Sequence, residues 1–153
     1  ELGEERKHKQ LIKKNILKIM PDLIITHSKN DYHSDHKSLN ILTNLAISHY
    51  IPILCCDTLM GINFQPNYYV EISDYFQMKK DAILQHKSQN PRRFVDLVTL
   101  MNSYRAAQCN LPKGLYAEAY CFTPSFPFSD LINILPPSPK LRPFYIKNRH
   151  GFL

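Results

Sequence analysis

Apolar residues recur first with a helical period and then with a strand period through the first third of the chain. Residues 4–20 place Leu11, Ile12 and Ile16 on one stripe among lysines, which predicts an amphipathic helix that stops before Pro21. The β-branched run behind Pro21 predicts a short strand that is buried on both faces. The elements predicted here are a helix over 4–20, a strand over 23–26, a helix over 35–49 with Ser34 or Asp35 as its N-cap, and a strand over 51–56.

The rest of the chain predicts a loop, two strands and two helices. Residues 57–67 contain Gly61 and Pro66 and read as a loop. Ser73 or Asp74 caps a helix that runs to about residue 89, and Asn90 begins the next helix, which runs to about residue 110. Strands are predicted over 68–72 and 115–122, and the six prolines within 124–143 exclude a helix or a central strand there.

The order strand, loop, helix, strand in the first half predicts a parallel crossover and therefore an α/β layered fold. A chain of 153 residues is long enough for one domain with a real core, and we expect one domain. No apolar run approaches the roughly 20 residues that a membrane span needs. The first residue is Glu1 and no signal-type stretch follows it, so we expect a soluble, cytoplasmic piece of a longer chain.

Composition adds two expectations. The net charge of +6, from 19 basic and 13 acidic residues, is spread in small groups that are typical of solvated helix faces. Attraction to an anionic partner, such as a phosphorylated sugar or nucleic acid, is the alternative interpretation. The four cysteines form no Cys-x-x-Cys pair and lie in apolar stretches, which predicts reduced core residues.

Candidate chemistry gathers in residues 26–36, which hold three histidines and two aspartates between the first strand and the second helix. In an open α/β sheet, a loop at the carboxyl end of a parallel strand is where ligands bind. His33 and His36 are three residues apart at a helix start, so both imidazoles can face one point and bind zinc. The spacing alone leaves a second interpretation open, namely a polar loop whose Ser34 and Asp35 only cap the helix.

The sequence resembles the PIG-L/LmbE-like family of zinc-dependent N-deacetylases, which includes enzymes that remove acetyl from N-acetylglucosamine linked to inositol or to other groups. Ordered matches over about a hundred residues are more specific than one short motif. The matching segments, in chain order, are Pro21 to His27, Asp31 to Lys37, Asp57-Thr58, Asn63 to Pro66, Tyr69 to Asp74, Lys80, His86 to Gln89, Gln108-Cys109 and Tyr116 to Tyr120.

The resemblance implies a Rossmann-like three-layer sandwich with a mainly parallel sheet, and zinc as the cofactor. It implies that His36 is a zinc ligand and that His33 supports the carbonyl oxygen as it becomes an oxyanion. Asp35 would orient and charge His33. Zinc would polarise the amide and lower the pKa of its water. The implied substrate is a small N-acetylated amino sugar or a related amide.

The chain also departs from the family pattern. In the family, two further zinc ligands and the general base lie in an Ala-His-Pro-Asp-Asp motif after the first strand, and that motif is absent here. We therefore predict a partial deacetylase domain over 1–123, with its first strand missing, and a Pro-rich extension over 124–153. A non-catalytic or degenerate α/β domain that binds an anionic partner is the alternative hypothesis.

Four further residues are predicted to bind substrate or to support the pocket: Asp31, Tyr32, His86 and Glu118. Glu118 alternates with tyrosines on a strand, so it is either a satisfied buried carboxylate or a substrate contact. The remaining histidines with no sequence partner, His27, His49 and His150, are predicted to be structural. Nucleic acid is not an expected partner, and a homo-oligomer is left open.

Overall fold

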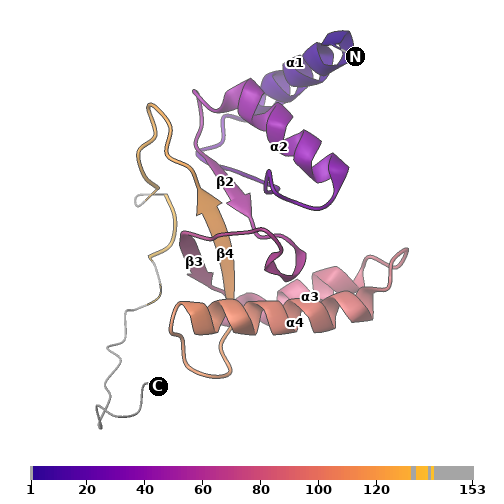
Figure 1. Ribbon diagram of the computed structural model, residues 1–153, viewed down its shortest axis with the longest axis vertical. Helices are drawn as coiled ribbons and strands as arrows, with labels where there is room; N and C mark the ends of the chain where they lie inside the picture. Colours follow the sequence, from indigo (N-terminus) through magenta and orange to yellow (C-terminus); the bar gives the residue numbers. More distant parts are fainter. Residues whose placement is uncertain (1, 132–133, 138, 140–153) are drawn as a thin grey trace.

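The computed structural model describes residues 2–131, 134–137 and 139 (Figure 1). The predicted order of helices and strands is confirmed, although the helix expected to reach residue 89 ends at Leu84. The elements are α1 (Leu2–Ile19), β1 (Ile24–Thr26), α2 (Ser34–Ile47), β2 (Ile53–Cys56), the 3-10 helix η1 (Leu59–Gly61), β3 (Tyr68–Glu71), the 3-10 helix η2 (Ser73–Tyr75), α3 (Phe76–Leu84), α4 (Pro91–Gln108) and β4 (Ala117–Phe122).

The described strands form one four-stranded sheet in the order β1-β2-β4-β3. The predicted parallel crossover is confirmed, since β1 pairs in parallel with β2 and Ile24 lies opposite Ile53. The expectation of a mainly parallel sheet is wrong for the described residues, because β4 runs antiparallel to both β2 and β3. Helix α2 carries the chain back along the sheet, so β2 begins at the same end as β1. The paired helices α3 and α4 instead leave the chain at the end where β3 finished, so β4 begins there and runs the other way. The fold is therefore a mixed α/β fold.

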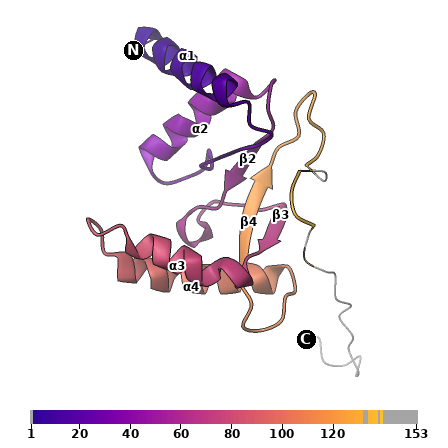
Figure 2. The same cartoon turned by 180° about the vertical axis from the view of Figure 1, so that it is seen from behind.

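The sheet lies between two pairs of helices, with α1 and α2 at one end of the molecule and α3 and α4 at the other (Figures 1 and 2). At the first end, Ala46, Ile47 and Ile51 form a buried cluster. The helical stripe of α1 packs against it through Ile12 and Ile16, whereas Leu11 of the predicted stripe is 56% exposed. No helix within the described residues combines the length and the apolar character that crossing a membrane requires.

Strand β1 differs from its prediction in burial. Ile25 is 57% exposed, although the sequence predicted a strand buried on both faces. The physical reason is position: β1 stands at the edge of the described sheet, and β2 is its only neighbour in that sheet.

A buried ion pair connects α4 to the carboxyl end of β2. Arg105 is 3% exposed, and it donates from Nε to Asp57 Oδ2 at 2.6 Å and from Nη2 to Asp57 Oδ1 at 3.0 Å. Its guanidinium also donates to Gln108 Oε1 at 2.5 Å and lies 5.9 Å from the ring centre of Phe64. Gly61 fits beside it for two reasons: its φ is +69°, and a methyl group there would lie 2.7 Å from Arg105 Nη2.

The predicted Pro-rich extension is described in part. Leu131 is 4% exposed, and the hydroxyl of Tyr68 on β3 donates to the carbonyl of Pro136. These contacts place the described part of the extension against the domain. Residues 140–153, which include His150, lie outside the described residues.

We expect Arg105→Leu to lower the free energy of unfolding by about 3–5 kcal/mol, because it leaves the Asp57 carboxylate buried without its cation. Burial already raises the pKa of Asp57 in spite of the hydrogen bonds and charge of Arg105, so the site tolerates an unpaired carboxylate poorly. Urea unfolding at neutral pH measures the loss. Arg92→Leu, an exposed position on the same helix, is the matched control.

The double variant Arg105→Leu/Asp57→Leu should recover part of this loss, since it removes both charges together. A free energy of unfolding for Arg105→Leu equal to that of the Arg92→Leu control would contradict a stabilising role for the pair.

Candidate metal centre

The candidate site is built from the loop that joins β1 to α2. His27 follows the last residue of β1, Asp31 lies in the turn, and His36 lies in the first turn of α2. Within the turn, the backbone N–H of Asp31 donates to the carbonyl of Ser28 at 3.2 Å, and the N–H of Asn30 donates to Ser28 Oγ at 3.1 Å. These local bonds fold the loop back so that residues nine apart in the sequence approach one another.

Asp31 is the buried anchor of the loop. It is 4% exposed, and its two carboxylate oxygens have different partners. Oδ1 accepts the backbone N–H of His33 at 3.0 Å, and Oδ2 lies 3.0 Å from Nδ1 of His36. Burial alone would raise the pKa of Asp31, but these hydrogen bonds and the neighbouring imidazoles outweigh it and lower that pKa.

The histidine rings are stacked beside this carboxylate. The rings of His27 and His36 are parallel to within 1°, with centroids 3.8 Å apart. The ring centroids of His33 and His36 are 4.7 Å apart. Two imidazoles that face one another closely repel when both are protonated. Burial, followed by the charge of His36, lowers the pKa of His27, while Asp31 opposes this shift.

His27, Asp31 and His36 could hold a metal ion. Each offers one ligand atom, and these three atoms all lie within 4.8 Å of one another. Two neutral imidazoles and one carboxylate are a donor set that suits zinc and other first-row divalent metals. The structure therefore contains a group at His36 that could hold a metal ion, while metal binding by His36 and the identity of the metal stay predictions.

Two of these three residues differ from the sequence interpretation. Asp31 was expected to support the pocket, and His27 was expected to be structural. Both join His36 through the turn, so His27 is the residue that sequence reasoning missed. Its position directly after a predicted parallel strand was the available signal, because side chains there lie at the carboxyl end of the sheet.

His33 is the N-cap of α2, in place of the expected Ser34 or Asp35. Its Nδ1 accepts the backbone N–H of Asp35 at 3.2 Å, so the neutral ring carries its proton on Nε2. The Asp35 carboxylate lies 4.0 Å from the same Nδ1, and its side chain is 86% exposed. In this arrangement the backbone of Asp35, more than its carboxylate, orients His33.

Tyr32 and His86 lie at the periphery. Tyr32 is 59% exposed, and its ring centre lies 6.4 Å from that of His33. His86 is exposed in the connection between α3 and α4, where its described hydrogen bonds join its backbone to Ile83 and Gln89. Their predicted substrate roles remain predictions.

Glu118 belongs to a separate polar network. Its Oε1 accepts from Lys79 Nζ at 2.6 Å, and its Oε2 accepts from the hydroxyl of Tyr120. Lys79 also donates to Asn102 Oδ1 at 2.9 Å. Burial would raise the pKa of Glu118, but the charge and hydrogen bonds of Lys79 prevail and lower it. The network lines a cavity of about 270 Å³ that also contacts Ile25.

The fold and the site define a mixed α/β chain with a candidate metal centre at the carboxyl end of its parallel strand pair. No family model and no curated protein matches the chain. Among solved structures, it is similar to the crystal structure of GalB, the 4-carboxy-2-hydroxymuconate hydratase from Pseudomonas putida KT2440, with a TM-score of 0.63 and 14% identity. The likeness covers 90% of this chain and 62% of that chain, and at this identity it shows the fold alone.

We expect the purified chain to bind zinc through these three side chains. Removing a residue that only supports a metal ligand lowers metal affinity by up to about 100-fold. Removing a ligand should therefore weaken zinc binding by at least that factor in each of the variants His36→Ala, His27→Ala and Asp31→Asn. Isothermal titration calorimetry with zinc measures the affinity. His49→Ala, an exposed histidine outside the group, is the matched control.

The same titration should show weaker binding as the pH falls from about 7 to about 5, because imidazole must be neutral to bind a metal. His27 keeps its neutral form further into this range than an ordinary histidine, since its pKa is lowered. Affinity that is equal in the wild type and the His36→Ala variant would refute the site.

Proposed function

We propose that this chain is part of a zinc-dependent N-deacetylase, which removes acetyl from an N-acetylated amino sugar or a related amide. The observation that carries the proposal is the grouping of His27, Asp31 and His36 with His33 beside them. The resemblance of Asp31 to Lys37 and of the later segments to the PIG-L/LmbE-like family supports this reaction class.

In the proposed site, His27, Asp31 and His36 hold the metal. Zinc, when bound, supplies a Lewis acid for the amide carbonyl and lowers the pKa of water. His33 is suited to donate a hydrogen bond from Nε2 to the carbonyl oxygen as negative charge develops there, because its Nδ1 is already occupied by the N–H of Asp35. The side chain of His33 is 48% exposed, so a substrate can reach it.

We further propose that another strand pairs with the outer edge of β1. Ile25 exposes 57% of its surface at this edge, and Thr26 Oγ1 is buried without a hydrogen-bond partner in the described residues. An edge strand leaves a row of backbone groups unpaired, which is the usual template for one more strand. Parallel addition at this edge would extend the β1–β2 pair toward the Rossmann-like sandwich that the resemblance implies, and would bring the family's further ligands beside His27.

The DNA that encodes residues upstream of Glu1 tests this added strand. We expect an in-frame apolar strand followed by a His-x-Asp-Asp motif. A stop codon or an unrelated polar sequence at that place would contradict the added strand and leave the three local ligands as the whole metal site.

Catalysis is tested by incubating the zinc-loaded protein with N-acetylglucosamine derivatives and measuring the release of acetate. We expect His33→Ala to lower kcat by roughly 100-fold, the range of losses when one oxyanion donor is removed, with little change in zinc affinity. His36→Ala should abolish both acetate release and zinc binding. The exposed Ser38→Ala variant in the same helix is the matched control.

Turnover by His33→Ala at the wild-type rate would remove His33 from the mechanism. If the zinc-loaded wild type releases no acetate from any N-acetylated sugar, the deacetylase proposal fails and the non-catalytic binding module takes its place.

A further inference from the structure

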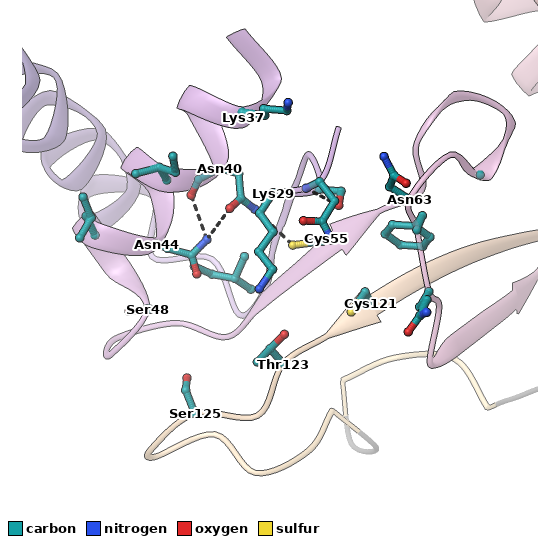
Figure 3. A pocket seen from close by; sticks show the side chains of 18 residues that line it. Lys29, Lys37, Asn40, Asn44, Ser48, Cys55, Asn63, Cys121, Thr123 and Ser125 are labelled. Carbon is teal, nitrogen blue, oxygen red and sulfur yellow. Dashed lines mark hydrogen bonds between the residues drawn. The ribbon is translucent and has the colours of Figure 1, made fainter. Parts of the chain in front are cut away.

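A second and larger cavity lies beside the metal loop. It has a volume of about 1320 Å³ and opens between α2, strands β2 and β4, and the loop that follows η1 (Figure 3). Its wall shares two elements with the metal centre. Lys29 lies between His27 and Asp31 in the loop, and Lys37 directly follows His36 in α2.

The charge of this cavity has one sign. Lys29 and Lys37 line it, and none of the described residues that line it is an aspartate or a glutamate. Within the described part of the chain, neither lysine forms an ion pair. Two ammonium groups without a protein counter-ion at one cavity attract an anion, because the concave wall concentrates their field.

Lys29 acts on the cavity itself. Burial raises the pKa of the Cys55 thiol on the cavity wall, and the hydrogen bond from Asn40 and, to a smaller extent, the charge of Lys29 partly offset this rise. Figure 3 shows the side chain of Lys29 extending into the space between Asn44 and Cys55. The ammonium of this exposed residue therefore lies where an anion in the cavity could reach it.

Uncharged polar groups complete the wall, and hydrogen bonds hold it to the metal loop. Asn40 is 4% exposed, and its Nδ2 donates to the carbonyl of His27 at 2.7 Å and to Cys55 Sγ at 3.3 Å. Asn44 Nδ2 in turn donates to the carbonyl of Asn40 at 2.9 Å. The Nδ2 groups of Asn40 and Asn44 thus donate within the protein, which leaves the Asn44 side-chain oxygen and the hydroxyls of Ser48 and Thr123 for sugar hydroxyls. Asn40 fixes this wall relative to His27.

We propose that this cavity binds a phosphorylated sugar, with Lys29 on the phosphate and the polar wall on the sugar ring. Lys37, which extends from the start of α2 away from Lys29 in Figure 3, adds positive charge at the same cavity. The inference rests on the proposed function, because it assigns the phosphate to the substrate whose acetyl group faces the metal centre. The two positive charges attract a phosphate, whereas an uncharged sugar gains nothing from them.

The test compares three probes by isothermal titration calorimetry with the whole chain: N-acetylglucosamine 1-phosphate, N-acetylglucosamine and inorganic phosphate. We expect the sugar phosphate to bind at least about tenfold more tightly than either of the other two, and its affinity to fall as salt is raised from about 50 to about 200 mM. The double variant Lys29→Gln/Lys37→Gln should raise its Kd at least about tenfold. Lys87→Gln/Lys113→Gln removes the same charge from exposed positions outside the cavity and should leave the Kd unchanged.

The His36→Ala variant separates this site from the metal centre. We expect it to lose zinc and to keep the sugar phosphate, whereas Lys29→Gln/Lys37→Gln should keep zinc. Retained binding in His36→Ala supports the phosphate site even if acetate release is never observed. Equal affinity for the sugar phosphate and N-acetylglucosamine, for the sugar phosphate and inorganic phosphate, or for the wild type and Lys29→Gln/Lys37→Gln would overturn the inference.

Discussion

The buried pair of Arg105 and Asp57 is the constraint on which the arrangement of the two cavities depends. A guanidinium that is 3% exposed must have its donors satisfied, and Asp57, at the carboxyl end of β2, accepts two of them. The pair therefore sets where α4 crosses the sheet. It also sets the path of the loop after β2, because Gly61 passes the guanidinium at a distance that excludes a side chain and Phe64 lies over it.

That loop separates two sites of different character. Leu59 and Met60 border the smaller cavity with Glu118, whereas Asn63 and Phe64 border the larger cavity with its lysines. One segment held by one ion pair thus shapes both recesses next to the β1–β2 strand ends. The loop's own bonds support the same course, since Thr58 Oγ1 donates to the carbonyl of Ile62 at 2.7 Å and the N–H of Phe64 donates to the carbonyl of Gly61 at 3.2 Å.

The metal centre is stabilised in a different way, by short-range contacts. Asp31 accepts the N–H of His33 and contacts His36, so the loop's own backbone places the carboxylate between its imidazoles. His36 and Asn40 of α2 both contact the loop: His36 Nδ1 lies 3.0 Å from Asp31 Oδ2, and Asn40 donates to the carbonyl of His27. At 14% identity the structural likeness shows only the fold, so metal binding is inferred from the candidate site itself.

Sequence periodicity determined the helices, the strands and the parallel β1–α2–β2 crossover, because each is set by side chains close together in the chain. It also located the candidate site in residues 26–36, because three histidines and two aspartates follow a predicted strand there. The tertiary structure alone decided that β4 enters antiparallel between β2 and β3, because strand order follows from how α3 and α4 pack as a pair. It likewise decided that His27 lies beside Asp31 and His36, and that Lys29 and Lys37 line one cavity. The folded turn brings these side chains together, and the spacing of residues in the sequence does not predict the path of that turn.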